Sequence, residues 1–191
     1  MAVKITTLQI QKLLADYKKT ELKNPCSWLN ICKGWKGKRS KVQMDDALLK
    51  FCTKSFRNTH YYRIRKSAMK NLNSRVKPLI PQIQKMKTFE DVYQCLLRIR
   101  ITGIGDLTVY DLSLLFSACI GLNLDKEPRY IYPHAGVSIG INRYCGFPKN
   151  RRTPYTITEL DKVRGNVFSK SGLSPASLEN FFCVYKSVFG D

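Results

Sequence analysis

The residues Ile101-Thr102-Gly103-Ile104-Gly105 decide the fold of this chain, because they form a short glycine-containing turn between two helical stretches. Before the turn, apolar residues follow helical spacing from Phe89 to about Arg100. Thr88-Phe89-Glu90-Asp91 has the Thr-x-x-Asp form related to a capping box and marks the start of this helix. After the turn, Asp106–Leu122 is strongly apolar over about five turns, which suits a core helix. The sequence therefore predicts two helices joined by a tight hairpin.

The two glycines of this hairpin suit a backbone that lies close to a ligand. Glycine allows positive φ, and Ile104 between Gly103 and Gly105 can fill the junction of the two helices. The first turn of the following helix presents N–H groups that have no partner inside the helix, and such groups bind phosphate without reading bases. The alternative is a structural turn that binds nothing.

This pattern resembles the helix-hairpin-helix family and, within it, the DNA glycosylase superfamily. The resemblance covers about Thr88 to Arg143, under a third of the chain. It implies an all-α fold of one or two lobes, in which the hairpin Gly103-Ile104-Gly105 grips the DNA backbone. It also implies a catalytic Asp about twenty residues after the hairpin.

Two residues are candidates for that catalytic position. Counting from Gly105 leads to Asp125, whereas alignment on the later helix places His134 where the family has Asp. A His can act as a base, but it cannot supply the permanent negative charge that stabilises an oxocarbenium-like transition state. The alternative to a catalytic role is that His134 is a surface residue or caps a helix. The family's nucleophilic Lys is replaced by Leu107, so Schiff-base lyase chemistry is not expected.

The charge of the chain indicates a polyanionic partner. Lys and Arg number 33 against 14 Asp and Glu, which gives a net charge of +19. Residues 1–80 hold 19 of the cations and only 4 of the acids. Nucleic acid is the partner expected of such a field, and the resemblance implies that this nucleic acid is DNA. The alternative is a basic surface that is only solvated. A membrane is not expected, because the sequence has no basic amphipathic helix with an aromatic face.

Further binding residues are predicted from the position of cations and aromatic rings. Those that extend the hairpin contact are Arg98, Arg100, Lys126, Arg129 and Arg143. Trp35 and Lys36 combine a ring that can stack on a base with a cation that can hold phosphate. Trp35 lies among glycines and charges, where little is expected to cover it. A site beside the hairpin would be lined by Tyr110, Asp111, Tyr132 and His134, although Tyr110 fits the core better.

Composition and missing motifs exclude several classes of protein. The 191 residues are 43% hydrophobic, enough for a core without disulfides. The sequence has no apolar run of about 18 residues and no secretory signal, so a soluble, cytoplasmic protein is expected. Seven scattered cysteines with no CxxC pair predict no disulfide framework, no metal and no cofactor. The sequence has no Ser/His/Asp hydrolase motif, no Walker motif and no dinucleotide-binding motif, so these three classes are not expected.

We expect one all-α domain over residues 1–191, with a basic lobe over about 1–80 and a helix-hairpin-helix region over about 88–144. The other predicted helices cover residues 5–17, 45–56, about 66–77, 135–144 and the segment from Pro175 onward, and residues 33–41 are predicted to form a loop. Three functions fit. They are a nucleic-acid-binding protein without catalysis, a monofunctional glycosylase of DNA repair, and a protein-interaction module that retained the fold.

Overall fold

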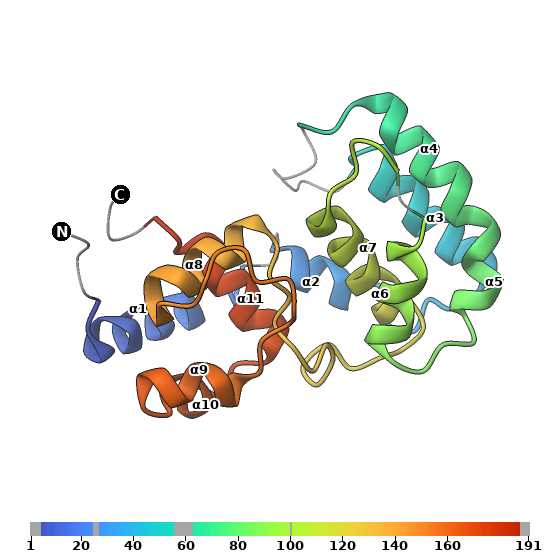
Figure 1. Cartoon of the computed structure of the whole chain (residues 1–191). Coiled ribbons are helices and arrows are strands. Elements are labelled where there is room, and N and C mark those ends of the chain that lie inside the picture. The colour runs from blue at the N-terminus through green and yellow to red at the C-terminus, as the bar shows by residue number, and fades with distance from the viewer. Residues whose placement is uncertain (1–4, 25–26, 56–62, 100, 188–191) are drawn as a thin grey trace. The chain divides into compact units, whose positions relative to one another are not determined.

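The computed structural model describes residues 5–24, 27–55, 63–99 and 101–187, and Figure 1 shows that they form helices joined by loops. In these segments the only β contact is an antiparallel bridge between Ile131 and Tyr155. The all-α prediction is therefore confirmed. No helix in the described segments is both long enough and apolar enough to cross a membrane.

The chain divides into two compact units. Unit 1 contains residues 1–24 and 125–191, and unit 2 contains residues 25–124. The predicted helix-hairpin-helix region, 88–144, therefore contributes to both units. Its hairpin belongs to unit 2, whereas His134 and the helix after it belong to unit 1.

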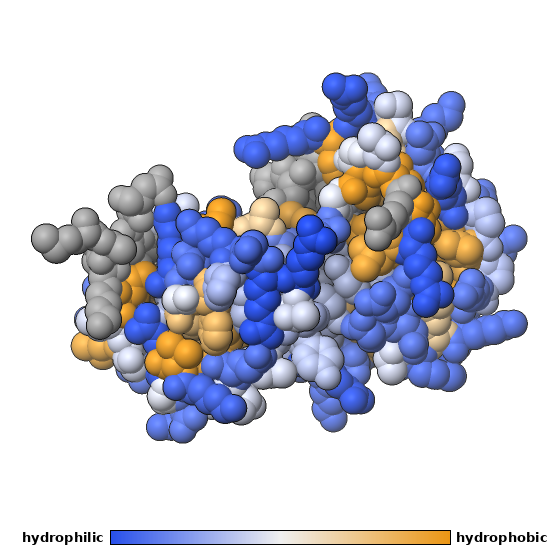
Figure 2. Space-filling model, viewed as in Figure 1, coloured by the Kyte–Doolittle hydropathy of each residue, from blue (hydrophilic) through white to orange (hydrophobic). Residues whose placement is uncertain are grey.

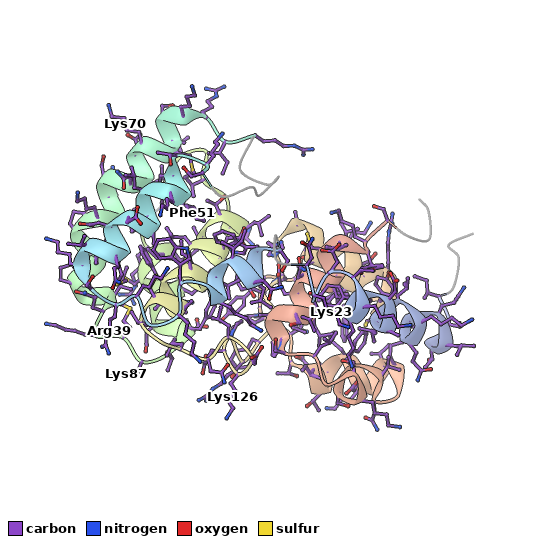
Figure 3. All side chains as sticks on the ribbon, turned by 180° about the vertical axis from the view of Figure 1, so that it is seen from behind. Lys23, Arg39, Phe51, Lys70, Lys87 and Lys126 are labelled. Atoms are coloured by element: carbon purple, nitrogen blue, oxygen red, sulfur yellow. The ribbon has the colours of Figure 1, made fainter. Side chains whose placement is uncertain are left out.

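Unit 2 is built around one apolar helix, α7 (Asp106–Cys119), in which 11 of 14 residues are buried. Three helices pack on α7, namely α2 (Trp28–Lys33), α3 (Lys41–Cys52) and α6 (Phe89–Leu97). On α3 pack α4 (Lys66–Val76) and α5 (Ile80–Ile83), which the 3-10 turn η2 (Lys77–Leu79) connects. Tyr110 of α7 packs edge-on against Phe89 with ring centroids 5.4 Å apart and is a core residue. Phe51 of α3 is also fully buried and lies among these helices in Figure 3.

Local signals explain where the helices of unit 2 begin. The Thr88 hydroxyl accepts from the Asp91 N–H at 3.1 Å and donates to the Asp91 carboxylate at 2.7 Å, so α6 begins as predicted. Helix α3 begins several residues before the predicted position, because Ser40 forms a full capping box with Gln43. Pro81 occupies the first turn of α5, where a missing N–H has no cost.

Unit 1 joins the two ends of the chain. It contains α1 (Thr7–Lys19), α8 (Ala135–Cys145), α9 (Ile157–Arg164), α10 (Val167–Ser171) and α11 (Pro175–Val184). The Tyr185 hydroxyl donates to the Asp16 carboxylate at 2.5 Å, and the Asn180 amide donates to the Tyr17 hydroxyl at 3.0 Å. Phe181, Phe182 and Tyr144 fill the core beneath these contacts.

Helices α8 and α11 approach closely because glycine removes the side chain between them. A Cβ atom at Gly140 would lie 2.4 Å from the Phe182 carbonyl oxygen. One at Gly136 would lie 2.8 Å from the Cys183 Sγ. This close packing aligns the beginning of α8 with the middle of α11, where His134 and Glu179 meet.

Candidate nucleic-acid interface

The hairpin between α6 and α7 is an exposed turn with one conformationally required glycine. Gly103 has φ of +87°, which a side chain would strain. The Ile104 N–H donates to the Ile101 carbonyl at 3.0 Å and closes the turn. Gly105 is the N-cap of α7 with φ of −90°, and open space surrounds its Cα. Only Gly103 therefore needs to be glycine for conformational reasons.

The beginning of α7 offers backbone donors to an anion. The Thr108 N–H bonds back to the Gly105 carbonyl at 3.0 Å, whereas the helix itself makes no use of the N–H groups of Asp106 and Leu107. Gly103, Gly105 and Asp106 are exposed, and Ile104 is half-buried. The Asp106 carboxylate opposes an anion at this position, because it adds a negative charge to the positive end of the helix.

The neighbour of the hairpin in the fold is the first half of α4. A Cβ atom at Gly103 would lie 3.5 Å from the Cβ of Ala68, and Figure 1 shows the hairpin loop beside the start of α4. Lys66 and Lys70 on this part of α4 are exposed. Sequence reasoning noted Lys66 only as the end of a basic and aromatic segment, and it did not single out Lys70. The signal that could have identified them is the lack of any acid between Asp46 and Glu90.

The structure places the cations predicted for unit 2 as follows. Arg98 is exposed at the C-cap of α6, a few residues before the hairpin, and Lys36 is exposed after α2. Arg100 lies outside the described residues.

Trp35 is buried, so the expectation that little covers it is wrong. It is only 9% exposed, and its ring lies 4.6 Å from the Lys38 Nζ and 5.1 Å from the Lys50 Nζ. The Gly37 N–H donates to the Ala118 carbonyl at 3.0 Å and holds this turn against α7. The ring therefore packs with cations of its own chain and has little surface left for a base.

The remaining predicted cations belong to unit 1. Lys126 is exposed. The Arg129 Nε lies 3.2 Å from the Glu127 carboxylate, at the surface. Arg143 donates to the Lys186 carbonyl and is half-buried. Arg129 and Arg143 are thus already bonded within unit 1.

Both candidates for the catalytic position also belong to unit 1. Asp125 is exposed, whereas His134 is 6% exposed and its Nε2 bonds the Glu179 carboxylate, which is equally buried. His134 is the N-cap residue of α8, but its side chain makes no capping bond. Sequence reasoning missed Glu179, whose signal is a lone charge in the apolar segment Leu178–Cys183.

The other residues expected to line a site are core residues of separate units. Tyr110 and Asp111 are buried in unit 2, and Tyr132 is buried in unit 1. In the segments that the structure describes, no group of three or more His, Cys, Asp or Glu side chains is arranged to hold a metal ion. Comparison of the chain with models of known families, with characterised proteins and with solved structures finds no significant match.

Proposed function

We propose that the protein binds nucleic acid, and DNA in particular, through unit 2, with the hairpin Gly103-Ile104-Gly105 holding one backbone phosphate. The observation that carries this proposal is an exposed glycine turn at the N-terminus of α7 in a strongly basic unit. Unit 2 contains 18 Lys and Arg against 6 Asp and Glu over residues 25–124. The partner of such a surface is a polyanion, and backbone amides bind its phosphates independently of base sequence.

The hairpin supports this role by its geometry. Positive φ at Gly103 turns the chain into α7, and Gly103, Gly105 and Asp106 at this turn are exposed. A phosphate at this position accepts hydrogen bonds from the helix N-terminus and is attracted by the helix dipole. No base contact is involved, so we expect binding with little sequence preference.

The test is a fluorescence-anisotropy titration of duplex DNA with the full chain, comparing Gly103→Ala with Gly121→Ala. Gly121 is the matched control, because it also lies in unit 2, has φ of +91° and has open space around it. Both variants lose about 1 kcal/mol of stability through backbone strain. We expect only Gly103→Ala to weaken DNA binding. Equal affinity of the two variants would overturn the role of the hairpin.

A further inference from the structure

Unit 2 contains a long stretch without acids that the hairpin does not explain. Between Asp46 and Glu90 the chain has no Asp or Glu, while it has 11 Lys and Arg. Helix α4 lies in the middle of this stretch. Its charge is therefore not balanced by any neighbour in the sequence.

The lysines of α4 and of the turn that follows it lie on one face, whereas the exposed Arg75 lies on another. The buried residues of α4, Ala68, Met69, Leu72 and Val76, face the core. The exposed residues Lys66, Lys70, Ser74 and Lys77 follow one another at spacings of three or four, which places them in one row. At 1.5 Å per residue the row is about 16 Å long. In Figure 2 hydrophilic side chains follow the outer edge of α4, and in Figure 3 Lys70 lies on its outer side.

The ammonium groups of this row have no carboxylate nearby. In the segments that the structure describes, none of these lysines is within ion-pairing distance of an acid, whereas Lys50 pairs with Asp46 at 2.9 Å. Arg39, elsewhere in unit 2, donates its Nε–H to the Gln84 carbonyl at 3.1 Å. The row on α4 is thus a set of cations that the fold itself does not use.

The row and the hairpin share the first turns of α4. Ala68 lies half a turn after Lys66, on the buried side of α4, and its Cβ lies 3.5 Å from the position of a Cβ at Gly103. The hairpin therefore lies on one side of α4 and the row on the other, about one helix diameter, roughly 10 Å, apart.

The chemistry of the row fits the backbone of a double helix. Lys is a compact point charge that suits phosphate, and the exposed face of α4 offers no apolar side chain to enter a membrane. Single strands are gripped by aromatic rings that stack on bases. The aromatic residues that the structure describes in unit 2 are buried or half-buried, so they offer little stacking surface.

We propose that the exposed row Lys66, Lys70, Ser74 and Lys77, on α4 and the start of η2, is a second phosphate-binding surface, which holds the backbone of a double helix across α4 from the hairpin. This inference rests on the proposed function. The hairpin supplies one phosphate contact through backbone amides, and α4 supplies up to three more through ammonium groups. Together they set the salt dependence of binding.

The experiment replaces the row in the full chain as Lys66→Gln, Lys70→Gln and Lys77→Gln. The control is Lys12→Gln, Lys18→Gln and Lys19→Gln on α1, which removes the same charge from exposed positions of unit 1. Gln keeps the helix propensity of Lys, so both variants are expected to fold. Affinity for duplex and single-stranded DNA is measured at several salt concentrations.

For the α4 variant we expect the negative slope of log affinity against log salt concentration to become shallower by about 2.7. We also expect its affinity for duplex DNA to fall about tenfold or more at 0.1 M salt. The control is expected to change the slope by less than about one. Equal effects of the two variants would overturn the α4 surface. The α4 surface would also be overturned if the α4 variant bound duplex normally while Gly103→Ala bound it weakly. This second result would leave the proposed function intact. Stronger binding of single strands by the native protein would overturn the assignment to a double helix, and no binding by the native protein would overturn the proposed function itself.

Discussion

The Nε2 of His134 bonds the carboxylate of Glu179 inside unit 1, and each residue is only 6% exposed. The two residues are 45 positions apart in the chain. They join the N-terminus of α8 to the middle of α11. This relationship gives the residue considered for catalysis a structural role that can be measured.

Removing one partner of this pair is expected to destabilise the protein. His134→Ala leaves Glu179 buried without its imidazole partner, which costs about 3–5 kcal/mol for a buried pair. Urea unfolding of the full chain measures the change. Arg129→Ala is the control, because the Arg129 side chain is 74% exposed, so solvent screens its pair with Glu127 and the pair is worth less than about 1 kcal/mol. A loss below about 1 kcal/mol for His134→Ala would contradict the structural role.

Neutralising Asp106 is expected to strengthen DNA binding and to lower the stability of the protein. Its carboxylate is exposed in the first turn of α7, where it repels a phosphate but favours the helix dipole. Asp106→Asn should raise affinity roughly two- to fivefold and cost about 0.3–1 kcal/mol of stability. Anisotropy titration and thermal unfolding give the two values.

The control for Asp106 is Glu90→Gln, which removes the same charge from the first turn of α6 in the same unit. It is expected to change affinity much less, because it does not lie at the hairpin. An equal gain in both variants would show that only net charge matters.

Adding one methyl group at Gly140 is expected to be costly. Ala is a better helix former than Gly by about 1 kcal/mol, but its Cβ would lie 2.4 Å from the Phe182 carbonyl oxygen. Backbone atoms on α11 cannot move aside, so Gly140→Ala should lose about 1–3 kcal/mol net through overpacking. Gly136→Ala meets the end of the Cys183 side chain instead and should lose less. Equal stability of the two variants in urea would refute the close contact of α8 and α11.

Stability is expected to fall at alkaline pH because buried thiols and phenols must ionise. Burial raises the pKa of Cys119, Cys145, Tyr93 and Tyr144 to about 12, from ordinary values of 9.0 for Cys and 10.0 for Tyr. The unfolded chain then releases these protons at lower pH than the folded chain. The stabilising contribution is complete below about pH 9 and is lost as the pH rises toward 12.

The measurement is urea unfolding at a series of pH values from 8 to 11. Each such group lowers stability by about 1.4 kcal/mol per pH unit once it has ionised in the unfolded chain alone. Cys145→Ala should make the decline shallower, since it removes one of these groups. Constant stability up to pH 11 would show that the thiols and phenols are not buried as described.

Much of the candidate site could be predicted from local sequence. The glycine hairpin, the cap at Thr88 and the apolar helix after Gly105 follow from contacts within four residues, which a sequence shows directly. Helices α2 and α10 were not predicted, because six and five residues are too few to show a period. Helix α9 carries a visible signal, Thr156 and Glu159 of a capping box, that sequence reasoning did not use.

The sequence by itself determined the helical class, the hairpin and the excess of positive charge, because periodicity, capping and composition are local properties. Only the tertiary structure decided that Trp35 is covered, that His134 meets Glu179 and that α4 lies beside Gly103. It also decided that Asp16 and Tyr185, 169 positions apart, hold the two ends of the chain together in unit 1. These relationships join residues far apart in sequence, and they depend on the path of the whole chain, which no local pattern records.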